Sequence, residues 1–176
     1  TESTSEDRMT LAGAGNALIA HDRIGPAVID AFRARPLAGL EVVELRGGGL
    51  AILDVLRGQD ALIVVDACAI GGSPGEQHEV ELPEILAGPL PARGTSLHQI
   101  GPVEALHVAA ELYPERMPRR VILLLVETEG LDEAGEALAR DLITSRVAAL
   151  AAEVLTRPAA PHEWHAAPDG AEGRNA

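Results

Sequence analysis

The sequence predicts a three-layer α/β sandwich, in which a mostly parallel, twisted sheet of about five strands has helices on both faces. Short apolar runs alternate along the chain with segments of helical periodicity, the order expected for strands joined by right-handed crossovers. Two runs, 61–65 and 121–126, are apolar over their whole length, as central parallel strands covered on both faces usually are.

In the first half of the chain, each predicted strand is followed by a predicted helix. The expected elements are a strand at 9–12, a helix at 26–35, a strand at 41–45, a short helix at 50–57 and a strand at 61–65. The first strand ends at Gly13 and Gly15. The helix that follows has Pro26 in its first turn and a shared apolar face that includes Val28 and Phe32.

The second half repeats this alternation with one exposed strand. The expected elements are an edge strand at 77–82, a helix at 101–112, a strand at 121–126 and a long helix at 134–155. The edge strand is indicated by alternation, with Val80 and Leu82 on one side. The last helix places Ile143, Val147 and Leu150 at helical spacing.

Length and composition fit one domain. The chain has 176 residues, of which 47% are hydrophobic and only 2% aromatic, so its core is expected to consist of aliphatic side chains. Residues 1–7 are polar and acidic and predict a disordered leader. Residues 157–176 lack periodicity and predict a flexible tail, which leaves 8–156 as a single α/β domain.

Charge and cysteine content exclude several classes of function. The formal net charge is −13, which disfavours a nucleic acid partner. The N-terminal residues lack the pattern of a signal peptide, and the longest apolar runs are too short to span a membrane. With Cys68 as the one cysteine, no internal disulfide can form, and we expect a cytoplasmic protein and, by default, a monomer.

Three predicted loops carry the residues that could perform chemistry. In parallel sheets, ligands bind where strands end and loops run into helices. Asp22 lies in the loop after the first strand, Asp66 directly follows the strand at 61–65, and His98 precedes the helix at 101–112. Two carboxylates and an imidazole from these loops could converge to bind a borderline divalent metal with positions left open for water or substrate.

Each of these residues also has a structural interpretation. Asp22 could cap the helix near Pro26, Asp66 could form a turn, and His98 could be a structural loop residue. Cys68 is interpreted as a small buried thiol, because the sequence shows no general base beside it. The remaining histidines are expected to be on the surface or hydrogen-bonded: His21, His78, His107, His162 and His165.

Three motifs in these loops resemble those of the [NiFe]-hydrogenase maturation endopeptidases. Residues 13–25, GAGNALIAHDRIG, are similar to that family's opening pattern G-x-G-N-x-L-x-x-D-[DE]-x-x-G. Asp66 resembles its central metal-binding aspartate, and residues 96–101, SLHQIG, resemble its S-x-H-Q-x-G motif. The joint match covers roughly residues 8–155.

The resemblance implies an endopeptidase that removes a C-terminal extension from the nickel-loaded large-subunit precursor of a [NiFe]-hydrogenase. The family's metal-binding residues fall on Asp22, Asp66 and His98. These would contact nickel carried by the precursor, with another divalent metal as an alternative in the isolated protein. Asp66 is the favoured general base and Asp22 the second catalytic carboxylate, as in an aspartate-dependent protease.

Four further residues are expected to recognise the substrate: Asn16, Gly47, Gly48 and Gln99. Two departures from the family pattern concern the same region. His21 stands where the family has the first acid of a pair, and Arg46 replaces an acid before the glycines at 47–49. His21 is a weaker candidate for an additional ligand.

Two other functions stay open. The chain could be a non-catalytic maturation chaperone of the same fold, since the acid before the glycines is lost. It could also be a Rossmann-like nucleotide binder, because residues 13–18 partly match a G-x-G-x-x-G loop. Leu18 occupies the third glycine position, and no acid ends the second strand, so the nucleotide interpretation ranks last.

Overall fold

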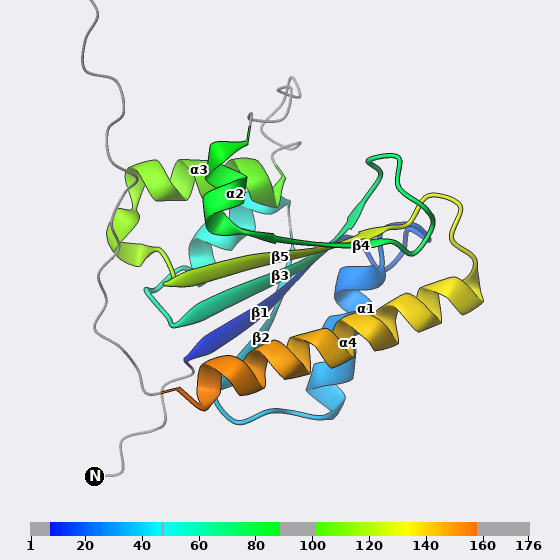
Figure 1. The fold of residues 1–176 in the computed structure, drawn as a ribbon, viewed down its shortest axis with the longest axis horizontal. Coiled ribbons are helices and arrows are strands. Elements are labelled where there is room, and N and C mark those ends of the chain that lie inside the picture. Colours follow the sequence, from blue (N-terminus) through cyan, green and yellow to red (C-terminus); the bar gives the residue numbers. More distant parts are fainter. Residues whose placement is uncertain (1–7, 47, 89–100, 158–176) are drawn as a thin grey trace, which may run out of the picture.

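A computed structural model describes residues 8–46, 48–88 and 101–157. These residues share one five-stranded sheet with the strand order β2-β1-β3-β5-β4 (Figure 1). The parallel strands are β1 (Met9–Ala14), β2 (Leu40–Leu45), β3 (Ala61–Cys68) and β5 (Arg120–Glu127). The remaining strand, β4 (Gln77–Glu81), pairs antiparallel with β5 at the edge. The predicted fold class is confirmed.

Helices cover both faces of the sheet. On one face lie α1 (Ile24–Ala34) and α4 (Glu133–Leu155) (Figure 1). On the other lie the 3-10 helix η1 (Gly49–Val55), α2 (Leu82–Ala87) and α3 (Pro102–Leu112). A short 3-10 turn, η3 (Pro114–Arg116), leads from α3 into β5.

Each layer has its own hydrophobic core. Ile29, Phe32 and Ile143 belong to the core between the sheet and α1 with α4, whereas Ile52 and Leu106 belong to the core on the opposite face. The central strands contribute alternate side chains to both cores, because successive residues of a strand point to opposite faces. Their continuous apolar sequence follows from this double burial.

The short helix expected at 50–57 is present as the 3-10 helix η1. Two other local predictions were wrong. The expected edge strand ends at Glu81, and Leu82 opens α2, which has Pro83 in its first turn and was not predicted. Asp66 does not begin a loop: β3 continues through Cys68, because β5 extends far enough to pair with it to Glu127.

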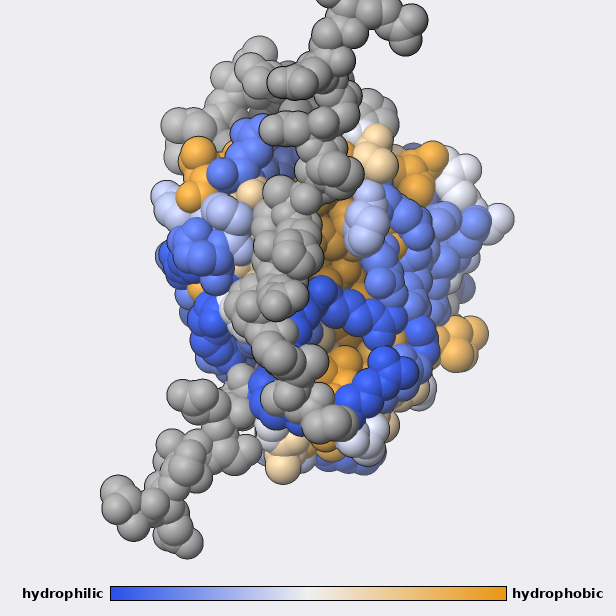
Figure 2. All heavy atoms as spheres, turned by 60° about the vertical axis from the view of Figure 1, so that its left-hand side comes forward, coloured by the Kyte–Doolittle hydropathy of each residue, from blue (hydrophilic) through white to orange (hydrophobic). Residues whose placement is uncertain are grey.

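The surface is mostly polar on the face that Figure 2 displays, where hydrophilic side chains surround a smaller apolar area. Within the described part of the chain, every helix is too short or too polar to cross a membrane. The expected leader at 1–7 lies outside the described residues, as does the predicted tail from residue 158 onward.

Candidate active site

A cleft of about 640 Å³ opens at the carboxyl ends of β1, β2 and β3, and Asp22 and Asp66 both line it. Strand β1 lies between β2 and β3 in the sheet. The chain runs from β1 through α1 to β2 on one side, whereas the connection after β3 leads to β4 on the other side. Such a point, where connections leave in opposite directions, is where open α/β sheets bind ligands. The fold therefore brings two of the three predicted site residues to the expected place.

Backbone hydrogen bonds hold Asp22 in a closed loop. The Asn16 amide donates to the Asp22 carbonyl at 2.8 Å, and the Asp22 amide donates to the Ile19 carbonyl at 2.9 Å. The side-chain oxygen of Asn16 accepts from the Leu18 amide at 2.9 Å. Gly15 has a φ of +119°, and a Cβ there would lie 2.2 Å from the Asp22 carbonyl oxygen. Only glycine allows this close approach.

The capping interpretation of Asp22 was wrong. The residue before α1 is Arg23, and no side chain caps that helix. Arg23 instead pairs with Glu136 of α4 at 2.6 Å, which ties the end of the loop to the helix layer below. The carboxylate of Asp22 is thus free of a capping role and lies in the cleft wall.

Asp66 has an altered acidity. The pKa of Asp66 is raised to about 6, mainly by burial and to a smaller extent by the nearby charge of Asp22, while a hydrogen bond from the Ala67 amide works in the opposite direction. A buried carboxyl with a pKa close to neutral pH is a frequent feature of general bases and acids. This carboxyl can accept a proton and return it under physiological conditions.

The rim of the cleft combines charge with exposed apolar surface. Arg46 donates to Glu44 at 2.9 Å, and this hydrogen bond is the main reason that the pKa of Glu44 is lowered. Gly48 lines the cleft with a φ of +94°. Leu18, also in the lining, is 94% exposed. The rim therefore presents an apolar contact and a neutralised acid to an incoming chain.

Three predicted site residues lie outside the described residues: His98, Gln99 and Gly47. The described chain resumes at Gly101, and Gly101 and Pro102 line the cleft where α3 begins. The position of the His98 side chain stays a prediction.

The other candidates have different outcomes. His21 is exposed and lines a neighbouring hollow instead of the cleft. Burial, followed by the charges of Glu127 and Asp66, raises the pKa of Cys68 to about 11, so a thiol nucleophile is disfavoured, as predicted. His107 is satisfied by a contact of 2.9 Å with the Ile85 carbonyl.

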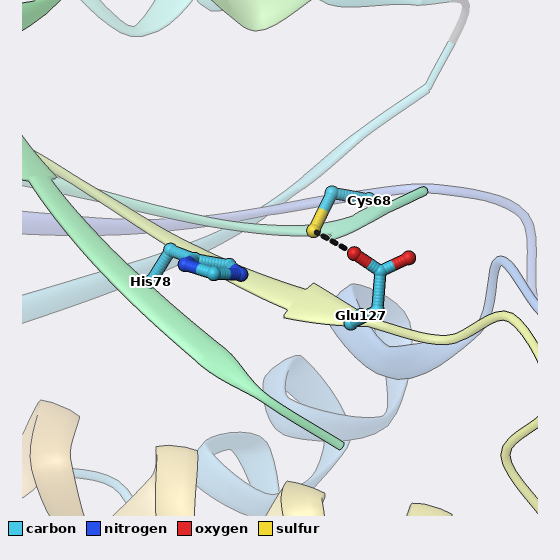
Figure 3. Close-up of side chains that lie close together, drawn as sticks. All are labelled: Cys68, His78 and Glu127. Atoms are coloured by element: carbon cyan, nitrogen blue, oxygen red, sulfur yellow. Dashed lines mark hydrogen bonds between the residues drawn. The ribbon is translucent and has the colours of Figure 1, made fainter. Parts of the chain in front are cut away.

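One expectation about the histidines was wrong. The Nε2 atom of His78 is buried next to Cys68 and Glu127, and no residue in the described part of the chain hydrogen-bonds to it (Figure 3). No sequence motif indicated this cluster, because its three residues meet only through the pairing of β3 and β4 with β5. His162 and His165 lie outside the described residues.

Fold and cleft define a doubly wound α/β protein with an acidic binding site at its switch point. A family model described as hydrogenase maturation protease matches residues 28–157. The hydrogenase expression/formation protein HupD of Thiocapsa roseopersicina is 33% identical over 145 residues, which is 81% of this chain and 64% of that protein. HupD of Bradyrhizobium diazoefficiens is 32% identical over 161 residues, or 87% of this chain and 80% of the other.

Solved structures agree at the level of the fold. The hydrogenase maturating endopeptidase HybD from E. coli superposes with a TM-score of 0.67 at 23% identity, covering 83% of this chain and 93% of that one. The maturation protease HybD from Thermococcus kodakarensis gives 0.62 at 18% identity, covering 82% and 99%. The chain belongs to the hydrogenase maturation protease family, a family of peptidases.

Proposed function

We propose that this chain is an endopeptidase that removes a C-terminal extension from the nickel-loaded large-subunit precursor of a [NiFe]-hydrogenase. The proposal rests on one observation above all: in a chain of the maturation protease family, Asp22 of the loop after β1 and Asp66 of strand β3 line the same cleft. The resemblance in the sequence motifs supplies the expected substrate, and the cleft supplies the acidic groups that such a substrate would require.

The nickel belongs to the substrate in this mechanism. Carboxylates and an imidazole suit a borderline divalent ion, so Asp22, Asp66 and His98 would contact nickel already held by the precursor. The adjacent peptide bond is then positioned beside Asp66, the favoured general base. A water oxygen attacks the peptide carbonyl, its proton passes to Asp66, and the leaving amine takes that proton as the bond breaks.

Recognition of the precursor is assigned to the cleft rim. Asn16 and Gly48 lie there, and Gly47 and Gln99 neighbour described parts of the same rim in the sequence. Leu18 offers exposed apolar surface for the extension. The protein is proposed to act as a cytoplasmic monomer. In the isolated state, the same acids would accept another divalent metal.

The test is incubation of the purified protein with nickel-loaded and nickel-free precursor, followed by mass measurement of the large subunit. We expect loss of the extension from the loaded precursor only, because contact with nickel positions the scissile bond. Cleavage of both forms at equal rates would refute the role of nickel in recognition.

Variants assign the roles of the acids. Asp22→Asn and Asp66→Asn should each lower the cleavage rate by about a hundredfold or more, since each removes a charge from the reacting centre. Asp54→Asn is the matched control, because Asp54 is exposed on η1 and outside the cleft lining. Undiminished cleavage by His98→Ala would remove His98 from the site.

A second candidate function is a non-catalytic maturation chaperone. The observation that favours it is the ion pair of Arg46 with Glu44, which puts a base where the family pattern has an acid and neutralises one carboxylate of the cleft. Retained binding of the loaded precursor with no change in its mass over a long incubation would support this candidate over the peptidase.

Nucleotide binding has less support. The first helix begins at Ile24, well after Gly15, and the cleft lining includes Asp22 and Asp66, whose charges oppose phosphate. A thermal-shift series with dinucleotides tests this point, and an unchanged melting temperature at saturating ligand excludes it.

A further inference from the structure

A second group of metal-ligating side chains lies beyond the cleft, at the ends of three neighbouring strands. This strand-end cluster consists of Cys68 on β3, His78 on β4 and Glu127 on β5 (Figure 3). One ligand atom from each residue lies within 4.8 Å of the other two. The Cys68 thiol faces the Glu127 carboxylate, with 3.9 Å between Sγ and Oε2.

Strand pairing sets this arrangement. Cys68 is the register partner of Glu127, and His78 is opposite Leu125, two residues before it. Because side chains alternate along a strand, Glu127 shares the face of Leu125, and His78 shares the face of Val80. Leu125 and Val80 both pack into the core beneath α2 and α3. The three ligands therefore converge on one face of the sheet.

The cluster contains polar atoms that the protein leaves unsatisfied. Glu127 is only 1% exposed, and among the described residues no ion pair neutralises it. Its Oε2 accepts from the Ile70 and Gly72 amides at 3.0 and 3.1 Å, but no described residue bonds to Oε1. The buried Nε2 of His78 likewise has no hydrogen-bond partner among the described residues. Burial of such groups is costly unless something compensates them.

A structural role for Glu127 explains only part of this pattern. Its two hydrogen bonds to the loop after β3 account for the position of one carboxylate oxygen. They do not account for the imidazole of His78, which extends toward Cys68 and Glu127 in Figure 3. A cation placed between the three side chains would satisfy the imidazole nitrogen and offset the buried negative charge together.

We propose that the strand-end cluster is a binding site for a divalent cation of the zinc type, separate from the Asp22–Asp66 cleft. Thiolate, imidazole and carboxylate are the groups that bind Zn²⁺ in proteins, and three of them leave a fourth position open. Bonds of about 2.0–2.3 Å put tetrahedral ligand atoms roughly 3.3–3.8 Å apart, so the cluster has to contract only slightly. On binding, the Cys68 thiol releases its proton to solvent.

Cobalt titration of the metal-free full-length protein tests the proposal, since Co²⁺ substitutes for Zn²⁺ and reports thiolate ligation by charge-transfer absorption. We expect one equivalent to produce this band, also in an Asp22→Asn background that disables the cleft. Cys68→Ser should abolish the band, while His78→Gln and Glu127→Gln should weaken cobalt affinity at least about tenfold.

The matched control is His107→Gln, because His107 is partly buried on the same side of the sheet but bonds to the Ile85 carbonyl instead. It should bind cobalt as the unmodified protein does. Absence of the band at saturating cobalt would overturn the proposal. A cobalt affinity, read from this band, that His78→Gln leaves unchanged would also overturn it. In the Asp22→Asn background, Zn²⁺ should also raise the melting temperature more than it does when His78→Gln is added, and an equal rise in both would contradict the site.

Discussion

Gly15 combines a positive φ with a close backbone contact that a residue with a Cβ could not make. Its φ of +119° and its contact with the Asp22 carbonyl let the loop close by a hydrogen bond from the Asn16 amide. The position of an acid in the cleft thus depends on the absence of a side chain seven residues earlier in the sequence.

We expect Gly15→Ala to lower precursor cleavage by about a hundredfold. The added Cβ pushes Asp22 away from its position in the cleft, and a misplacement of about 1 Å can cost a reaction that much. The free energy of unfolding should fall by only about 1–2 kcal/mol, since the loop is exposed. Cleavage rate and urea denaturation measure the two effects separately.

Gly71→Ala is the matched control for this variant. Gly71 has a similar φ of +89°, but a Cβ there would meet nothing within 4 Å. The control also places alanine at a positive φ but without the collision, so near-normal cleavage is expected. An equal loss of cleavage in both variants would show that the contact with Asp22 is not the cause.

Individual site residues differ in how far the sequence could predict them. Asp22 and Asp66 were predictable because they come after the apolar runs of β1 and β3, and such positions meet at one end of a parallel sheet. His78 and Glu127 were not, because their proximity depends on the antiparallel register of β4 against β5. Alternation of apolar and polar residues shows which face of a strand is buried, but it does not show which residue of the neighbouring strand lies opposite a given residue.

Among the elements, the strands were the most predictable. Their apolar runs are short and bounded, and double burial gives β3 and β5 a continuous apolar sequence. The six-residue helix α2 was missed because it is too short to show a helical period, and its proline sits in the first turn. Similarly, the 3-10 geometry of η1 is not distinguished from a short α-helix by apolar spacing.

One buried side chain joins β1 to the end of η1. Gln59 is 6% exposed and donates to the Thr10 hydroxyl at 3.0 Å and to the Val55 carbonyl at 2.9 Å, and its oxygen accepts from the Arg57 amide at 3.0 Å. Gln59→Leu should lower the free energy of unfolding by about 2–4 kcal/mol, because it leaves several buried polar groups unpaired. Urea denaturation measures the loss.

The exposed Gln77 on β4 provides the control for that variant. Gln77→Leu should change the free energy of unfolding by no more than about 0.5 kcal/mol. If both substitutions have equal effects, the hydrogen bonds of Gln59 are not what stabilises the junction.

The whole molecule carries a formal net charge of −13 and an acidic cleft. A negative field attracts cations and basic segments and raises their rate of encounter. The proposed substrate combines a metal cation with a peptide extension, and we expect the encounter step to depend on ionic strength.

Raising salt from about 50 mM to about 500 mM should therefore lower kcat/KM for the loaded precursor several-fold while kcat changes little, because screening acts on the charges before contact. Initial rates over a range of precursor concentrations separate the two constants. A kcat/KM that stays constant or rises with salt would exclude electrostatic attraction of the precursor.

The two acids of the cleft rest on different layers of the molecule. Asp22 lies on the connection into α1, which packs with α4, whereas Asp66 shares the sheet face that packs against α3. Substitutions in the core under α1 and α4 should therefore displace Asp22 more than Asp66, and substitutions in the core under α3 should do the reverse.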